Sequence, residues 1–230
     1  MKPLLSSPLR TSVLRAAALL PCLALWACSA KPPTPEWQMN AHGAARKATE
    51  AYLSGEPRIA QLEWDRARAE VARTGRPDLL ARVELMRCAA QVASLVVEPC
   101  TAFEALRADA APQDQAYADY LAGTIDSTAA AHLPEPQRSA WAGGPAAQAG
   151  LADPLSRLVA AGVWVKTGRE TPQVVDSAVE AASAQGWRRP LLAWLTLAAQ
   201  RADQRGDGPA AAAARRRLAV LEEGLSAEKR

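Results

Sequence analysis

Proline and glycine recur along this chain at positions that predict where helices begin and end. Several segments open at or near a proline, which suits the first helical turn because the missing N–H group is not needed there. Several end just before a glycine, the residue that most easily adopts the left-handed conformation of a helix C-terminus. The expected helices cover residues 36–54, 57–73, 77–97, 100–108, 113–125, 136–141, 154–167, 172–184, 190–204 and 209–223.

The residues between these breaks favour helix over strand. Ala, Leu, Arg, Glu and Gln dominate, β-branched residues are sparse, and Phe occurs once. We therefore predict an all-α fold.

The segment 77–97 indicates how the helices are arranged. Its apolar residues form two rows at helical spacing, and a single polar row remains. The apolar rows are Leu79, Val83, Met86, Ala90, Ala93, Val97 and Leu85, Cys88, Val92, Leu95, and the polar row is Glu84, Arg87, Gln91, Ser94, Glu98. A helix with two apolar faces has to be covered from both sides, so we expect it inside a layered stack of helices.

The region 48–67 follows the pattern of a helical hairpin. A small residue, Ala48, precedes Gly55 at the turn, and Ala60, Trp64 and Ala67 follow on the next helix. This pattern resembles the tetratricopeptide repeat family, and a weaker echo is Trp194, Leu197, Ala198 and Ala210. The resemblance implies a tetratricopeptide-like array of helical hairpins, an α-solenoid or helical bundle. A generic helical array is the alternative.

The N-terminus has the charge order of a secretory signal. Lys2, Arg10 and Arg15 precede an apolar run over residues 16–27. This run is shorter than the roughly 20 apolar residues that span a bilayer. It therefore predicts a targeting segment.

The end of the apolar run predicts lipidation at Cys28. Leu25, Ala27 and Cys28 resemble the bacterial lipobox, although Trp26 is bulkier than usual there. Cleavage after an alanine, leaving a free thiol at Cys28, is the alternative. The resemblance implies a lipoprotein held by acyl chains, and Ser29 after the cysteine implies sorting to the periplasmic face of the outer membrane.

The rest of the chain divides at breaks in the helical pattern. We expect a signal peptide at 1–27, the lipidated cysteine with a Pro-rich tether at 28–35, and an N-terminal helical subdomain at 36–126. A Pro- and Gly-rich connector at 127–153 leads to a C-terminal helical subdomain at 154–230.

Charge does not point to nucleic acid as a partner. The chain has 27 Lys and Arg against 24 Asp and Glu, and three of the cations lie in the signal peptide. The mature part is therefore balanced at 24 against 24. We expect no nucleic acid partner on this basis.

The remaining cysteines and the histidines predict a disulfide and no metal site. Cys88 and Cys100 form an even pair in an oxidising compartment, which favours a disulfide over two buried thiols, the alternative. His42 and His132 lie far apart in the sequence, and neither has ligands at metal-binding spacing nearby. We therefore expect no metal and no cofactor.

Catalytic motifs do not emerge from the sequence. It contains no nucleophile elbow, zinc-protease motif or phosphate-binding loop. Glu63 or Glu104 could act as the single acid of a peptidoglycan hydrolase, but solvated surface charges are the ordinary interpretation. We expect a protein that is not an enzyme.

The candidate partner-binding residues are Trp187, Arg188 and Arg189. An aromatic residue beside two arginines at an inter-helix turn is typical of binding hot spots. In the alternative, Trp187 closes the end of the core and the arginines pair with acids such as Asp176 or Glu180.

Two classes of function follow. The first is a non-enzymatic, outer-membrane-anchored periplasmic lipoprotein that binds a protein partner in envelope assembly or secretion. The second is a cell-wall hydrolase or polysaccharide-binding domain. That second class requires an acid in a groove lined by the aromatic candidates Trp141, Trp164, Tyr117 and Tyr120.

Overall fold

All regular structure in the described part of the chain is helical. The computed structural model describes residues 33–228, and helices are the only regular elements in that range. The all-α prediction is therefore confirmed. The description below concerns the unit Pro35–Arg230. In the described range, no helix has the length and apolarity needed to cross a membrane.

The helices follow the predicted order. They are α1 (Glu36–Ser54), α2 (Pro57–Ala72), α3 (Pro77–Ala93), α4 (Thr101–Glu104), α5 (Pro112–Ala122), α6 (Glu135–Gly143), α7 (Pro154–Lys166), α8 (Pro172–Gln185), α9 (Arg188–Gln204) and α10 (Gly208–Glu228). Three short 3-10 helices complete the set: η1 (Arg107–Asp109), η2 (Ala129–His132) and η3 (Pro145–Gly150). Proline opens α2, α3, α7 and α8, as the sequence predicts.

Helix α3 ends four residues earlier than its apolar pattern predicts. Leu95 adopts the left-handed conformation, with φ at 58°. The N–H of Leu95 donates to the Val92 carbonyl, and the N–H of Val96 donates to the Gln91 carbonyl, each at 3.0 Å. This pair of bonds is the helix-ending motif that glycine usually supplies. Because leucine occupies the glycine position, the sequence gives no sign of the break.

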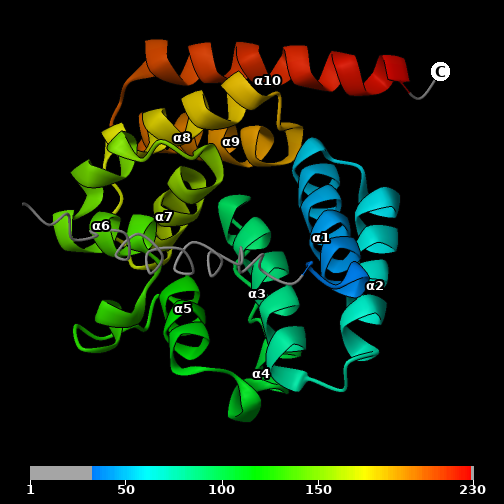
Figure 1. Ribbon diagram of the computed structural model, residues 1–230. Coiled ribbons are helices and arrows are strands. Elements are labelled where there is room, and N and C mark those ends of the chain that lie inside the picture. The colour runs from blue at the N-terminus through cyan, green and yellow to red at the C-terminus, as the bar shows by residue number, and fades with distance from the viewer. Residues whose placement is uncertain (1–32, 229–230) are drawn as a thin grey trace, which may run out of the picture. The chain divides into compact units, whose positions relative to one another are not determined.

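Helix α3 occupies the middle of this unit. It packs against α1 and α2 on one side and against α5 and α7 on another. Figure 1 shows α3 between the antiparallel pair α1–α2 and the helices α5 and α7, with α10 lying across α8 and α9. The predicted burial of α3 between helices is therefore confirmed.

One hydrophobic core joins the two halves of this unit. Its buried residues run from Leu53 at the end of α1 to Ala214 in α10, so they come from both predicted subdomains. Elements η2, α6 and η3 fall within the predicted connector, and they pack on α5, α7 and α8. A second cluster lies between α1 and α2 around Trp64, which is 2% exposed.

Helices α3 and α7 approach each other closely at Gly162. A Cβ atom added at this position would lie 2.3 Å from the carbonyl oxygen of Val92 and 2.9 Å from a methyl carbon of the same residue. A side chain of any size would collide with the backbone of α3. The crossing of these two helices therefore depends on glycine at this position.

The polar row of α3 is less exposed than its sequence indicates. Glu84 is 2% exposed and forms an ion pair with Arg68 of α2. Ser94 is also buried, and its hydroxyl donates to the Ala90 carbonyl at 3.1 Å. Met86, expected in an apolar row, is 37% exposed. Helix α2 covers part of the polar row, so the row does not form a continuous solvent-facing surface.

Candidate functional site

The predicted binding residues lie where α9 meets the end of α1. Trp187 is the residue before α9, and its ring is 7% exposed within the main core. Its Nε1 donates to the Glu50 carboxylate of α1 at 3.0 Å. The ring therefore offers no open face to a partner, and the predicted binding edge is reduced to the two arginines.

Both arginines hold α9 against the C-terminal end of α1. Arg188 donates from Nε to the Ser54 carbonyl at 3.0 Å, and Arg189 donates from Nε to the Tyr52 carbonyl at 2.8 Å. The Arg189 guanidinium also lies over the Tyr52 ring, 4.3 Å from its centroid. The Ser54 carbonyl is among those that the end of a helix leaves without an intrahelical partner, whereas the Tyr52 carbonyl also accepts from the Gly55 N–H at 3.2 Å. Asp176 and Glu180 border a separate hollow on α8.

The same two arginines also form one end of a groove along α9. The groove has a volume of about 660 Å³. Its α9 wall follows helical spacing, and the opposite wall comes from the end of α3 and from α7. The lining residues are Gly55, Ser94, Leu95, Val96, Val165, Arg188, Arg189, Leu192, Ala193, Thr196, Leu197 and Gln200.

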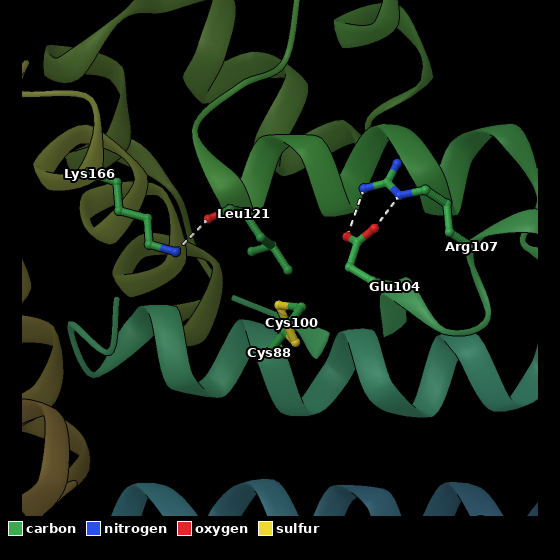
Figure 2. Close-up of a disulfide and its surroundings, with 6 residues drawn as sticks. All are labelled: Cys88, Cys100, Glu104, Arg107, Leu121 and Lys166. Atoms are coloured by element: carbon green, nitrogen blue, oxygen red, sulfur yellow. Dashed lines mark hydrogen bonds and ion pairs between the residues drawn. A yellow bond between two sulfur atoms is a disulfide. The ribbon is translucent and has the colours of Figure 1, made fainter. Parts of the chain in front are cut away.

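The α3 side of the groove is held in place by a disulfide. Cys88 in α3 and Cys100 just before α4 are joined with their Cα atoms 5.9 Å apart, which confirms the predicted pair. Figure 2 shows this bond linking α3 to the segment that leads into α4. The segment between the two cysteines carries Leu95 and Val96 of the groove wall. The disulfide therefore restrains the wall at both of its ends.

A hydrogen bond from α9 also holds the α3 side of the groove in place. The Nε1 of the buried Trp194 donates to the carbonyl of Ala93, the last residue of α3, at 2.9 Å. Leu95 follows two residues later in its left-handed conformation. A non-glycine residue in this conformation is strained, and such strain is concentrated at functional sites.

Two cationic side chains lie at one end of the groove. Among its lining residues, the ionisable ones are Arg188 and Arg189. Both lie in the first turn of α9, which has no acidic residue and no side-chain cap. The helix dipole adds positive potential at that end. Burial raises the pKa of the neighbouring Tyr52, and the positive charge of Arg189 opposes this shift.

Of the two single-acid candidates, Glu104 does not have the environment of a proton donor. Arg107 donates to both carboxylate oxygens of Glu104, at 2.7 and 2.9 Å (Figure 2). These bonds lower the pKa of Glu104, whereas an acid catalyst at neutral pH requires a raised one. Glu63 lies 4.0 Å from Arg66 on the same helix. In the described range, no group of acidic, histidine or cysteine side chains is arranged to hold a metal ion.

The four aromatic candidates come together, but as a packed stack. The Trp141 and Trp164 rings are parallel at 5.3 Å, and Tyr120 meets Trp141 edge-on at 6.1 Å. Tyr117 stacks on Tyr120 at 6.1 Å. Tyr120 and Trp164 are fully buried, and burial raises the pKa of both tyrosines. These rings serve the core between α5, α6 and α7, and their stacked faces are closed to a sugar.

Sequence reasoning found the arginines and missed the rest of the groove. Leu95 and Val96 were expected inside a helix. Val165 and Leu192 carry no signal beyond their apolar character, and Leu197 was noted only in the weaker tetratricopeptide-like echo. Only the assembled helices bring these residues together. Comparison with known proteins adds no relative: no family model, no curated protein and no solved structure matches this chain significantly.

Proposed function

We propose that this chain is a non-enzymatic lipoprotein whose helical domain binds a protein partner in envelope assembly or secretion. In this proposal Cys28, which lies outside the described residues, carries the acyl chains that hold the protein on the periplasmic face of the outer membrane. The signal-like N-terminus, the lipobox-like end of its apolar run and the Pro-rich tether support this placement.

A tetratricopeptide-like arrangement is part of the proposal. The α1–α2 hairpin buries Ala48, Ala60, Trp64 and Ala67, and Gly55 makes the left-handed turn between the two helices. In tetratricopeptide repeats these positions hold the two helices together. Helical-hairpin arrays present grooves between neighbouring helices, and such grooves suit protein ligands.

The groove along α9 is the observation that carries the proposed function. It combines an apolar lining, two arginines at one end and a strained residue in its wall. Apolar grooves with a few placed polar groups are typical binding sites. The alternative, a cell-wall hydrolase or polysaccharide-binding domain, has no comparable support because its aromatic residues stack in the core and Glu104 is held ionised by Arg107.

Photo-crosslinking in cells tests this function. A photoreactive amino acid at Thr196, exposed within the groove, is expected to give a discrete crosslinked species with a single periplasmic or outer-membrane protein. The same amino acid at Gln113, exposed on α5, is the matched control and should give none. Equal patterns from both positions, or no crosslink from Thr196, would contradict partner binding at this groove.

Cys28→Ala tests the anchor separately. Because the acyl chains are the proposed means of membrane attachment, this variant is expected to lose incorporation of labelled palmitate and to move from the membrane fraction to the soluble periplasmic fraction. Cys22, the other cysteine of the N-terminal segment, lies within the apolar run, and Cys22→Ala is the control that should remain labelled and membrane-bound. Continued labelling of Cys28→Ala would rule out this anchor.

A further inference from the structure

The groove dimensions and charge point to a defined class of ligand. We infer that the groove along α9 receives a short amphipathic helix of the protein partner, with a carboxylate at the end beside Arg188 and Arg189. This inference rests on the proposed function and names the chemistry of the partner. The α9 wall runs from Arg189 to Gln200, which corresponds to roughly 16 Å and about three helical turns.

The walls of the groove favour a helix over an extended peptide. A β-type extended ligand pairs its backbone with a strand edge, and the described part of the chain contains no strand. A polyproline-type ligand docks on aromatic side chains, and the groove lining has none. A helical ligand satisfies its own backbone and presents side chains at intervals of three and four residues. The α9 wall has the same spacing in Arg189, Ala193, Thr196 and Gln200. The small Ala193 at its centre allows a second helix to approach closely.

The apolar residues of the groove lie between its polar ends. Leu192 and Leu197 of α9 line the groove together with Leu95, Val96 and Val165. Each of these side chains is partly exposed, so a ligand with an apolar face would remove them from water. Thr196 adds little polarity because its hydroxyl donates to the Leu192 carbonyl at 2.7 Å. The apolar face of an amphipathic helix matches this lining.

Charge fixes the orientation of the ligand. Arg189 makes its two contacts with neutral groups of Tyr52, namely the carbonyl and the ring, so these contacts leave its positive charge in place. No lining residue of the groove is acidic, and the carboxylates near this end are Glu50, which accepts from Trp187, and Glu98, whose charge acts on Tyr52. A carboxylate at this end would form a charge-assisted hydrogen bond and would also meet the positive end of the α9 dipole. A ligand helix antiparallel to α9 would place its own negative end at the same position.

Helical peptides measure this preference directly on the full-length protein in detergent micelles. The first probe is a fluorescent peptide of about 14 residues, roughly four turns, stapled on its polar face, with leucines along the other face and glutamates in its last turn. The second has lysines in place of the glutamates. The third has a central proline, which breaks the helix. By fluorescence anisotropy we expect the glutamate peptide to bind about tenfold more tightly than either of the others.

Variants within the groove show where the peptide binds. Ala193→Trp fills the centre of the groove and should weaken binding of the glutamate peptide at least tenfold, an effect of about 1.4 kcal/mol or more. Thr196→Trp, at an exposed position, replaces Ala193→Trp if that variant has a lowered melting temperature. Gln204→Trp, on α9 outside the groove lining, should bind as the unaltered protein does. Circular dichroism checks the fold of each variant.

The outcomes separate this inference from the proposed function. Equal affinity for the glutamate and lysine peptides, equal affinity for the proline peptide, or binding unaffected by both tryptophan variants would overturn the inference. A crosslink from Thr196 in cells would still support a protein partner in that case. Peptide binding without any crosslink in cells would instead contradict the proposed function.

Discussion

Gly162→Ala is expected to destabilise the helical domain by about 3 kcal/mol. The added methyl group would lie 2.3 Å from the Val92 carbonyl oxygen, and neither helix backbone can move away without disturbing the packing of α3 on α7. The intrinsic preference of alanine for helix opposes this effect by at most about 1 kcal/mol. Chemical denaturation followed by circular dichroism measures the difference.

Gly43→Ala is the matched control for this prediction. Gly43 also lies inside a helix, α1, and a Cβ atom there would have no neighbour within 4 Å. This variant should therefore gain roughly 0.5–1 kcal/mol, because only the helix preference changes. If Gly162→Ala were stabilised to the same extent, the result would contradict a close crossing of α3 and α7 at this position.

Removal of the disulfide is expected to cost about 3 kcal/mol in the double variant Cys88→Ser/Cys100→Ser. The bond closes a loop between residues 12 apart in sequence, and closing such a loop restricts the unfolded chain. In the presence of a reductant, the denaturation midpoint of the unaltered protein should fall to that of the variant. The segment that carries Leu95 would also lose one of its restraints, so affinity for the glutamate peptide should fall with stability.

The double variant supplies its own control, because a reductant should leave its midpoint unchanged. Mass spectrometry of the non-reduced protein gives a second check. Two free thiols at Cys88 and Cys100 in the folded protein would contradict the bond.

Helix boundaries could be predicted where proline and glycine mark them. The predicted range 36–54 coincides with α1, which ends at Ser54 and is followed by Gly55 in the left-handed conformation. The end of α3 could not be predicted, because Leu95 takes the conformation expected of glycine and is held there by contacts outside its own segment. Local patterns record local preferences, and tertiary packing can override them.

The candidate site was predictable only in part for the same reason. The composition of the turn before α9 drew attention to Arg188 and Arg189, but spacing gave no sign that they contact carbonyls of residues 134 and 137 positions away. The sequence left open whether Trp187 binds a partner or closes the end of the core. The structure buries its ring in the core, where its partner Glu50 comes from the first helix. Contacts between distant segments determine whether such a residue is buried or free to bind.

The contact between α9 and α1 has a mechanical consequence. In an open array of repeats each unit touches only its neighbours, so the ends can unfold one after another. Here three side chains at the start of α9 donate hydrogen bonds to the end of α1, more than 130 residues away in the sequence. A force applied through the segment before α1 would therefore act on α9 as well. Under such a force the domain should unfold cooperatively, in a single step.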